Sequence, residues 1–252
     1  MKFEVAACTD IGRRKDLNQD SYWVWRIRKN ESEMIFAILC DGMGGLDAGE
    51  AASGFVVRAF REWVQSDFLR QISFLNMDSD QAFWRSWVQK THSRLQTWAD
   101  RNEKRTGTTM TALVMNETKI QVCHAGDTRL YCVAGKVRKM TEDHTLAEWR
   151  RKSGLDPADA GHILIQGIGA FSGADPDFFQ ADRQHGACYL LCSDGFYHSA
   201  TENELKRLFA FSRRKNRQRL AKACFRQMEK NLHRGETDNM TVIVIGVSET
   251  DL

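Results

Sequence analysis

The chain has 252 residues, and 36 Lys and Arg against 33 Asp and Glu leave a formal net charge of +3. No apolar run approaches the ~20 residues that span a bilayer, and the first ten residues lack the basic and apolar regions of a signal peptide. We therefore expect a cytoplasmic protein without a membrane span. The basic stretches at 150–152 and 213–219 contain no interleaved aromatic residues, so they are interpreted as solvated helix faces and not as nucleic-acid contacts.

Hydrophobic periodicity predicts strands and helices in a definite order. Apolar runs at 2–8, 21–28 and 34–40 predict strands, and helical spacing follows at 48–64 and at about 80–104. The later elements are expected as strands at 110–115, 119–125, 130–134, 187–192 and 240–247, with helices from 201 and from about 217 to 232. The order contains no βαβ alternation, so it favours an α+β fold over a doubly wound parallel one.

Residues 146–184 differ from the rest of the chain. They show little periodicity and contain both prolines, Pro157 and Pro176. We interpret this segment as a short helix followed by a mobile surface loop.

Aspartates recur where an apolar run meets a turn. Taken singly, each Asp-Gly pair is most simply explained as a turn. Taken together, five acids at strand ends can converge on one rim of a sheet, and their glycine and asparagine neighbours allow close approach of the backbone. The five are Asp20, Asp41, Asp127, Asp194 and Asp238.

Several carboxylates in one place repel each other unless hard cations lie between them. Oxygen ligands suit magnesium and manganese and do not suit zinc. Two such ions can activate a water and stabilise the oxygens of a phosphoryl group, so the chemistry indicates metal-assisted hydrolysis of a phosphoester. The competing interpretation, a glycosidase carboxylate pair, uses two acids and leaves three without a role.

The residues around these acids resemble, in order, the motifs of the metal-dependent type 2C protein phosphatases, the PPM family. The match runs from Thr9 to Val247, and its DGMGG form resembles the compact bacterial branch. The resemblance implies a single domain over residues 1–252, built as a four-layer α/β/β/α sandwich in which helix pairs flank a central antiparallel β-sandwich. It also implies a flap subdomain at about 146–184. The matching segments are 12–20, Asp41-Gly42-Met43-Gly44-Gly45, Gly107-Thr108-Thr109, 125–129, Glu142-Asp143-His144, Ser193-Asp194-Gly195 and Asp238-Asn239.

The resemblance also implies roles for the acids. Asp41 would bridge two Mn²⁺ or Mg²⁺ ions, with the Gly42 carbonyl on the second ion, while Asp194 and Asp238 would hold the first. These three aspartates are the expected catalytic residues, because a water bridging the ions would attack phosphorus. Asp20 would hold metal-bound waters, and Asp127 with Asp194 would hold a third, weaker ion. The segment 107–109 is expected to form core strand structure beside the site.

The chain departs from the family pattern at three positions. Lys15 stands where an arginine usually binds the substrate phosphate, so either Lys15 takes that role or Arg13 or Arg14 does. Gln19 replaces a glutamate near the metals. Met43 replaces the histidine that animal enzymes are thought to use as general acid, which leaves that step to a metal-bound water or to His144. The alternative for His144 is a hydrogen-bonding structural role.

The resemblance implies a Mn- or Mg-dependent protein serine/threonine phosphatase, which would act on phosphoproteins and oppose a bacterial Ser/Thr kinase. We expect a monomer without a nucleic-acid partner. One rival is a catalytically weak or inactive PPM-fold regulator that binds phosphoproteins, which predicts loss of metal aspartates. A second rival is a binding module whose basic helix at 213–219 docks a partner or a membrane surface.

Overall fold

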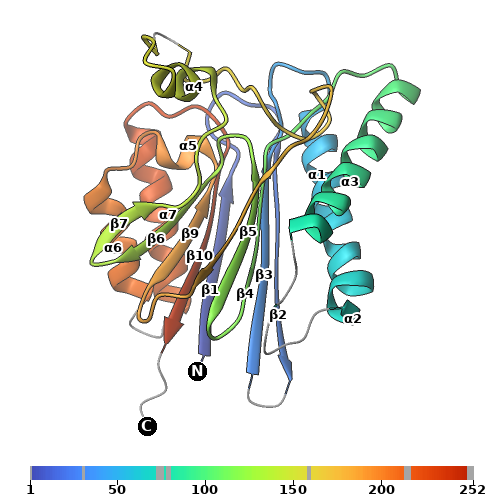
Figure 1. The fold of residues 1–252 in the computed structure, drawn as a ribbon. Helices are drawn as coiled ribbons and strands as arrows, with labels where there is room; N and C mark the ends of the chain where they lie inside the picture. Colours follow the sequence, from blue (N-terminus) through green and yellow to red (C-terminus); the bar gives the residue numbers. More distant parts are fainter. Residues whose placement is uncertain are drawn as a thin grey trace.

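The computed structural model describes residues 2–29, 32–71, 77, 81–157, 160–212 and 217–248. Two five-stranded antiparallel sheets pack face to face in the order β1-β10-β9-β6-β7 and β2-β3-β4-β5-β8 (Figure 1). The strands are β1 (Lys2–Asp10), β2 (Asp20–Lys29), β3 (Ser32–Asp41), β4 (Met110–Met115), β5 (Lys119–Ala125), β6 (Arg129–Ala134), β7 (Lys136–Lys139), β8 (Asp177–Asp182), β9 (Cys188–Cys192) and β10 (Met240–Ser248).

Helices cover the outer face of each sheet (Figure 1). The first group is α1 (Gly49–Trp63), the π-helix η1 (Val64–Phe68), α2 (Leu69–Gln71) and α3 (Gln81–Arg101), and the second is α5 (Asp194–Tyr197), α6 (Glu202–Ser212) and α7 (Arg217–His233). A further helix, α4 (Leu146–Lys152), lies at the end of the sandwich opposite the chain termini (Figure 1). The expected four-layer α+β sandwich is confirmed.

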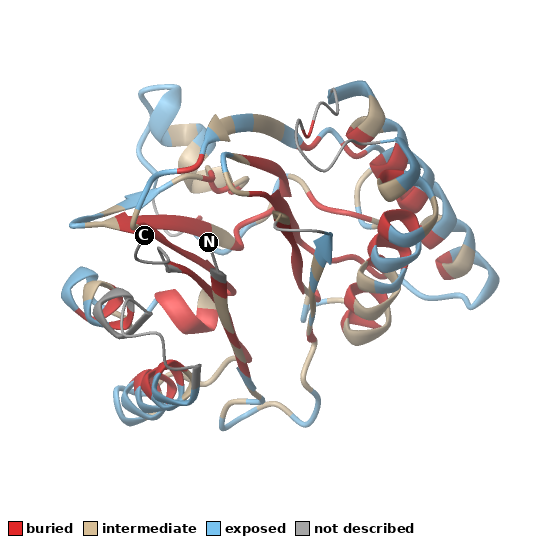
Figure 2. Ribbon diagram, turned by 90° about the horizontal axis from the view of Figure 1, so that it is seen from below, coloured by how far each residue is buried: buried red, intermediate tan, exposed pale blue. Residues whose placement is uncertain are grey.

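Strand β3 shows why the sheets are apolar on both sides. Its odd-numbered residues, such as Ile35 and Leu39, pack against Ile243 of the other sheet. Its even-numbered residues, such as Phe36, pack beneath α1 and α3 together with Trp84. Because helices and the opposite sheet cover the two faces, residues 33–40 are buried without interruption. Buried residues accordingly occupy the inner sides of both helix layers and the space between the sheets (Figure 2).

The elements predicted from periodicity are present, but the short β7 and α5 were not predicted, and one segment was assigned wrongly. The segment expected to be a loop through residue 184 contains β8, which pairs with β5 at the edge of its sheet. Its outer position leaves its side chains exposed or half-buried, so it lacks the apolar signal of an inner strand. Of the basic stretch at 213–219, residues 213–216 lie outside the described part of the chain and the remainder begins α7. No helix within the described residues is both long and apolar enough to cross a membrane.

Candidate metal centre

The antiparallel register brings the five strand-end aspartates to one end of the sandwich. Asp20 and Asp41 are directly paired partners on β2 and β3. Asp127 follows β5, Asp194 follows β9 and Asp238 precedes β10. All of them except Asp20 line a cavity of about 520 Å³, whose wall also includes Lys15 and the Gly42 backbone. Asp20 itself is 8% exposed.

The loop after Asp41 is fixed by the segment 107–109. The Asp41 amide donates to the Thr109 hydroxyl at 2.9 Å, and the Asp41 carbonyl accepts from the Thr109 amide and the Thr108 hydroxyl, each at 2.8 Å. Gly42 must be glycine here, because a Cβ atom would lie 2.3 Å from the carbonyl oxygen of Gly49. Segment 107–109 is buried beside the site, but the expected strand structure there is limited to an isolated bridge at Thr108, because β4 begins only at Met110.

Burial and mutual repulsion make the cluster costly when its acids are ionised. Burial, with added repulsion from the neighbouring Asp194, raises the pKa of Asp20 and of Asp127 to about 7 despite opposing hydrogen bonds. Burial likewise raises the pKa of Asp41 well above its ordinary value, with added repulsion from Asp20 and Asp194. A carboxylate cluster of this kind is stabilised by bound cations.

The position of Asp20 also fits a cation site. Its Oδ2 atom accepts from the Ser193 hydroxyl at 2.8 Å, whereas Oδ1 is buried without a hydrogen-bond partner. An unpaired buried carboxylate oxygen is rare and requires compensation. A metal ion, or water held by one, would supply a partner of the right charge, so the residues present fit the implied Mn²⁺ or Mg²⁺.

The carboxylates of Asp194 and Asp238 accept hydrogen bonds from backbone amides. Asp194 Oδ1 accepts from the Gly195 amide at 2.6 Å, and Asp238 Oδ1 accepts from the Asn239 amide at 2.8 Å. Within the described residues no three Asp, Glu, His or Cys side chains already stand in a metal-binding arrangement. The strands nevertheless gather four of the five strand-end carboxylates around one cavity.

The three basic candidates for phosphate binding are placed differently. Lys15 lines the cavity, and its Nζ atom lies 2.9 Å from Asp238 Oδ1. Partial burial lowers the pKa of Lys15, but the hydrogen bond with Asp238 and the charges of Asp41 and Asp194 outweigh it and raise the pKa overall. Arg13 and Arg14 are exposed and do not line this cavity.

His144 has the contacts of a structural residue. Its Nδ1 atom accepts from the Gly126 amide at 3.2 Å, and its Nε2 atom lies 3.1 Å from Asp177 Oδ2. Its ring packs 4.9 Å from that of His124, and it does not line the cavity.

The sequence interpretation did not single out four cavity residues, His162, Leu164, Ala170 and Phe171. They belong to the weakly periodic segment, where no local pattern indicates which side chains face the acids. Their placement depends on an isolated bridge between Thr108 and Ile168, which returns the chain to the site.

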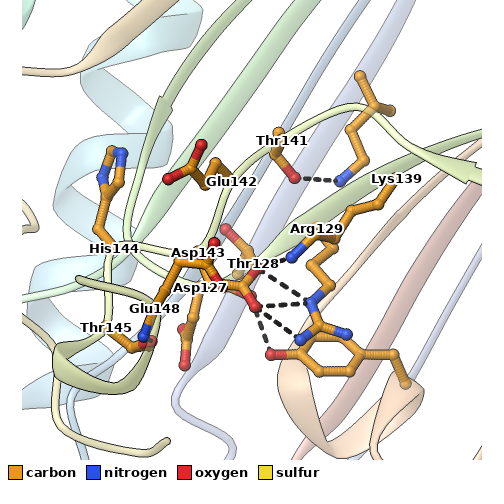
Figure 3. Close-up of polar contacts among 12 residues, drawn as sticks. Asp127, Thr128, Arg129, Lys139, Thr141, Glu142, Asp143, His144, Thr145 and Glu148 are labelled. Carbon is orange, nitrogen blue, oxygen red and sulfur yellow. Dashed lines mark hydrogen bonds and ion pairs between the residues drawn. The ribbon is translucent and has the colours of Figure 1, made fainter. Parts of the chain in front are cut away.

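A charged cluster centred on the buried Asp143 lies behind Asp127. Arg129 points toward Asp143, with Asp127 beside the pair (Figure 3). The guanidinium donates to Asp143 at 2.6–3.2 Å, and Lys139 Nζ lies 3.1 Å from the same carboxylate. Burial alone would raise the pKa of Asp143, but its hydrogen bonds and charge attraction to Arg129 lower it below the usual range. This pair fixes the start of β6, two residues after Asp127.

Comparisons with known proteins agree with the fold and the motifs. The protein phosphatase 2C family model matches residues 11–234. The serine/threonine phosphatase stp of Listeria monocytogenes is 28% identical over 247 residues, covering 94% of this chain and 93% of that protein. A crystal structure of a bacterial serine phosphatase aligns over 100% of both chains with a TM-score of 0.86 and 23% identity. The catalytic domain of the phosphatase PstP in complex with 2 manganese ions aligns over 98% of this chain and 99% of that one, with a TM-score of 0.77 and 25% identity. With the aspartate motifs gathered at one end of this sandwich, the chain belongs to the protein phosphatase 2C family.

Proposed function

We propose that the protein is a Mn²⁺- or Mg²⁺-dependent protein serine/threonine phosphatase. The observation that carries this proposal is the convergence of Asp41, Asp127, Asp194 and Asp238 on a single cavity that also contains Lys15. Carboxylates bind hard cations, and the ammonium group offers a point charge for phosphate. The similarity to a manganese-containing phosphatase domain supports the choice of ion.

Each acid has a distinct task in this proposal. Asp41 would hold both ions, the Gly42 carbonyl would help to hold the second, and Asp194 and Asp238 would hold the first. Asp20 would hold metal-bound water, and Asp127 with Asp194 would hold a third ion. When bound, the ions supply an activated water and neutralise the charge that develops on the phosphoryl oxygens.

The remaining groups orient the substrate. Lys15 would bind the phosphate oxygens at the cavity wall, while Asp238 holds its ammonium in place. The segment 146–184 would act as a flap subdomain, because His162 and Phe171 bring it to the cavity edge. We therefore assign recognition of the polypeptide around the phosphorylated residue to this segment.

The substrate class follows the relatives, which are named serine/threonine phosphatases. We propose phosphoserine and phosphothreonine in cytoplasmic proteins as substrates, including the targets of an opposing Ser/Thr kinase. The alternative of an inactive PPM-fold regulator predicts lost acids, whereas all five strand-end aspartates are present.

The test is hydrolysis of p-nitrophenyl phosphate and of a phosphothreonine peptide with manganese, with and without chelator. Asp194→Asn should lower kcat at least about 100-fold, since it removes a ligand from the activating ions. Asp182→Asn changes an exposed acid of β8 and should remain within about twofold of wild type. Absence of manganese-dependent turnover, or full activity of Asp194→Asn, would overturn the proposal. If the protein hydrolyses p-nitrophenyl phosphate but not the phosphothreonine peptide, the proposal of a protein substrate is wrong.

A further inference from the structure

Two of the cavity acids lie on elements that are distant in sequence, so only tertiary contacts can fix their relative position. Asp127 belongs to the loop between β5 and β6, whereas Asp194 is the first residue of α5. Helix α5 has four residues, which is too short to be stable without tertiary contacts. The direction of the Asp194 side chain therefore depends on how α5 is docked.

Tyr197 joins these two elements. It is the last residue of α5 and is 6% exposed. Its hydroxyl donates to the main-chain carbonyl oxygen of Asp127 at 3.0 Å. On the other side of the helix, the Asn231 side chain of α7 donates to the Phe196 carbonyl at 2.7 Å. The Tyr197 hydrogen bond thus ties the Asp194 helix to the Asp127 loop.

The aromatic ring of Tyr197 is itself held in place. The Arg129 guanidinium carbon lies 3.6 Å from the ring centroid, in cation–π contact. Arg129 is in turn fixed by its bidentate pairing with Asp143 (Figure 3). A planar guanidinium clamped by a carboxylate has little freedom to move, so the ring beneath it has one preferred position.

We propose that Tyr197 is a positioning residue that sets the relation between Asp127 and Asp194, and through it the affinity of the cavity for a divalent cation. The inference rests on the proposed metal-dependent function. Without the Tyr197 hydroxyl, the hydrogen bond between α5 and the Asp127 loop is lost. The cation must then order the carboxylates of Asp127 and Asp194 itself, which reduces its free energy of binding.

The chain offers a matched control in Tyr131. Its hydroxyl accepts from Arg129 Nη1 at 3.0 Å, and the residue is 8% exposed. Tyr131→Phe and Tyr197→Phe therefore each remove one buried hydroxyl from the surroundings of the same guanidinium. Tyr197→Phe alone removes the contact with the Asp127 carbonyl.

The experiment measures Mn²⁺ binding by isothermal titration calorimetry on chelator-treated, full-length protein without substrate. Tyr197→Phe should weaken at least one class of Mn²⁺ sites about tenfold, while Tyr131→Phe stays within about twofold. The Tm of both metal-free variants should fall by similar, small amounts. Raising Mn²⁺ to saturation should restore the kcat of Tyr197→Phe toward wild type, which a misfolded site would not show.

A second route keeps the test decisive if Tyr197→Phe is unstable. Asp143→Asn weakens the ion pair that holds Arg129 against the Tyr197 ring. It should weaken Mn²⁺ binding about threefold in protein that retains the wild-type circular dichroism spectrum. Unchanged Mn²⁺ affinity in Tyr197→Phe, unchanged affinity in Asp143→Asn where Tyr197→Phe is unstable, or equal weakening in Tyr131→Phe would overturn the inference while leaving the proposed phosphatase intact. Absence of Mn²⁺ binding by the wild type would instead overturn the proposed function and this inference together.

Discussion

The Nζ atom of Lys15 lies 2.9 Å from Oδ1 of Asp238. The contact joins the residue proposed to bind phosphate to a residue proposed to bind metal. Both side chains are partly exposed, at 33% and 42%, so the ion pair itself adds little to folding stability. Its consequence is positional, because it holds a cation at the edge of an acidic cavity.

Substitution of Lys15 should separate phosphate binding from chemistry. Lys15→Ala should raise the KM for a phosphopeptide about tenfold, which corresponds to the ~1.5 kcal/mol of one charge-assisted hydrogen bond. Lys15→Arg should lower KM, because a guanidinium can bind two phosphate oxygens. Steady-state kinetics on both variants checks this, with the exposed Arg14→Ala as control. An unchanged KM in Lys15→Arg would count against the role.

Divalent cations should stabilise the fold, and the effect should depend on pH. The pKa of Asp20 and of Asp127 is raised by burial to about 7, so metal-free stability should fall as pH rises from about 4 toward 7. Mn²⁺ at 100 times its Kd should add about 3 kcal/mol at pH 8 and less at pH 5, where protons compete. Urea unfolding with Mn²⁺ and with chelator at the two pH values measures this. Equal stabilisation by Mn²⁺ at pH 5 and pH 8 would contradict the proposed competition between protons and cations.

Gly126 should tolerate no side chain. Its φ is +115°, and a Cβ atom would lie 2.6 Å from the Thr109 side chain, which itself braces Asp41. Gly126→Ala should cost about 3 kcal/mol of unfolding free energy. Gly135 also has a positive φ, +80°, but open space around it, so Gly135→Ala should cost only about 1 kcal/mol. Urea midpoints that are equal for the two variants would refute the steric argument.

The buried carboxylate of Glu204 should stabilise the fold at neutral pH and lose this effect in acid. Arg234 donates to both of its oxygens at 2.7 and 2.9 Å, and this hydrogen bonding lowers the pKa of Glu204 well below its ordinary value. The stabilisation is therefore present above the unfolded-state pKa of about 4.5 and is lost as pH falls below it.

Glu204→Gln should accordingly cost about 2 kcal/mol at pH 7 and much less at pH 2. The exposed Glu202, which pairs with Lys206, provides the control, and Glu202→Gln should leave the free energy of unfolding close to the wild-type value at both pH values. Chemical denaturation at both pH values measures the difference. A Glu204→Gln effect that does not change with pH would show that packing, and not charge, is responsible.

The amino-acid sequence determined most elements and the identity of the acids. Helical spacing located α1 and α3, and strand-end aspartates such as Asp41 and Asp194 were recognisable because a buried strand must end in a polar turn. These signals are local, because periodicity and turn chemistry act over a few residues. Strand β8 could not be predicted in the same way, since its position at a sheet edge leaves it without an apolar repeat.

The tertiary structure decided how the acids are supported. Asp20 faces Asp41 only through the β2–β3 register, and Tyr197 reaches the Asp127 carbonyl across 70 residues of sequence. His162 enters the cavity wall because the chain returns along Thr108. No local pattern encodes such contacts, because they arise when distant elements are packed together and each buried polar group must find its partner.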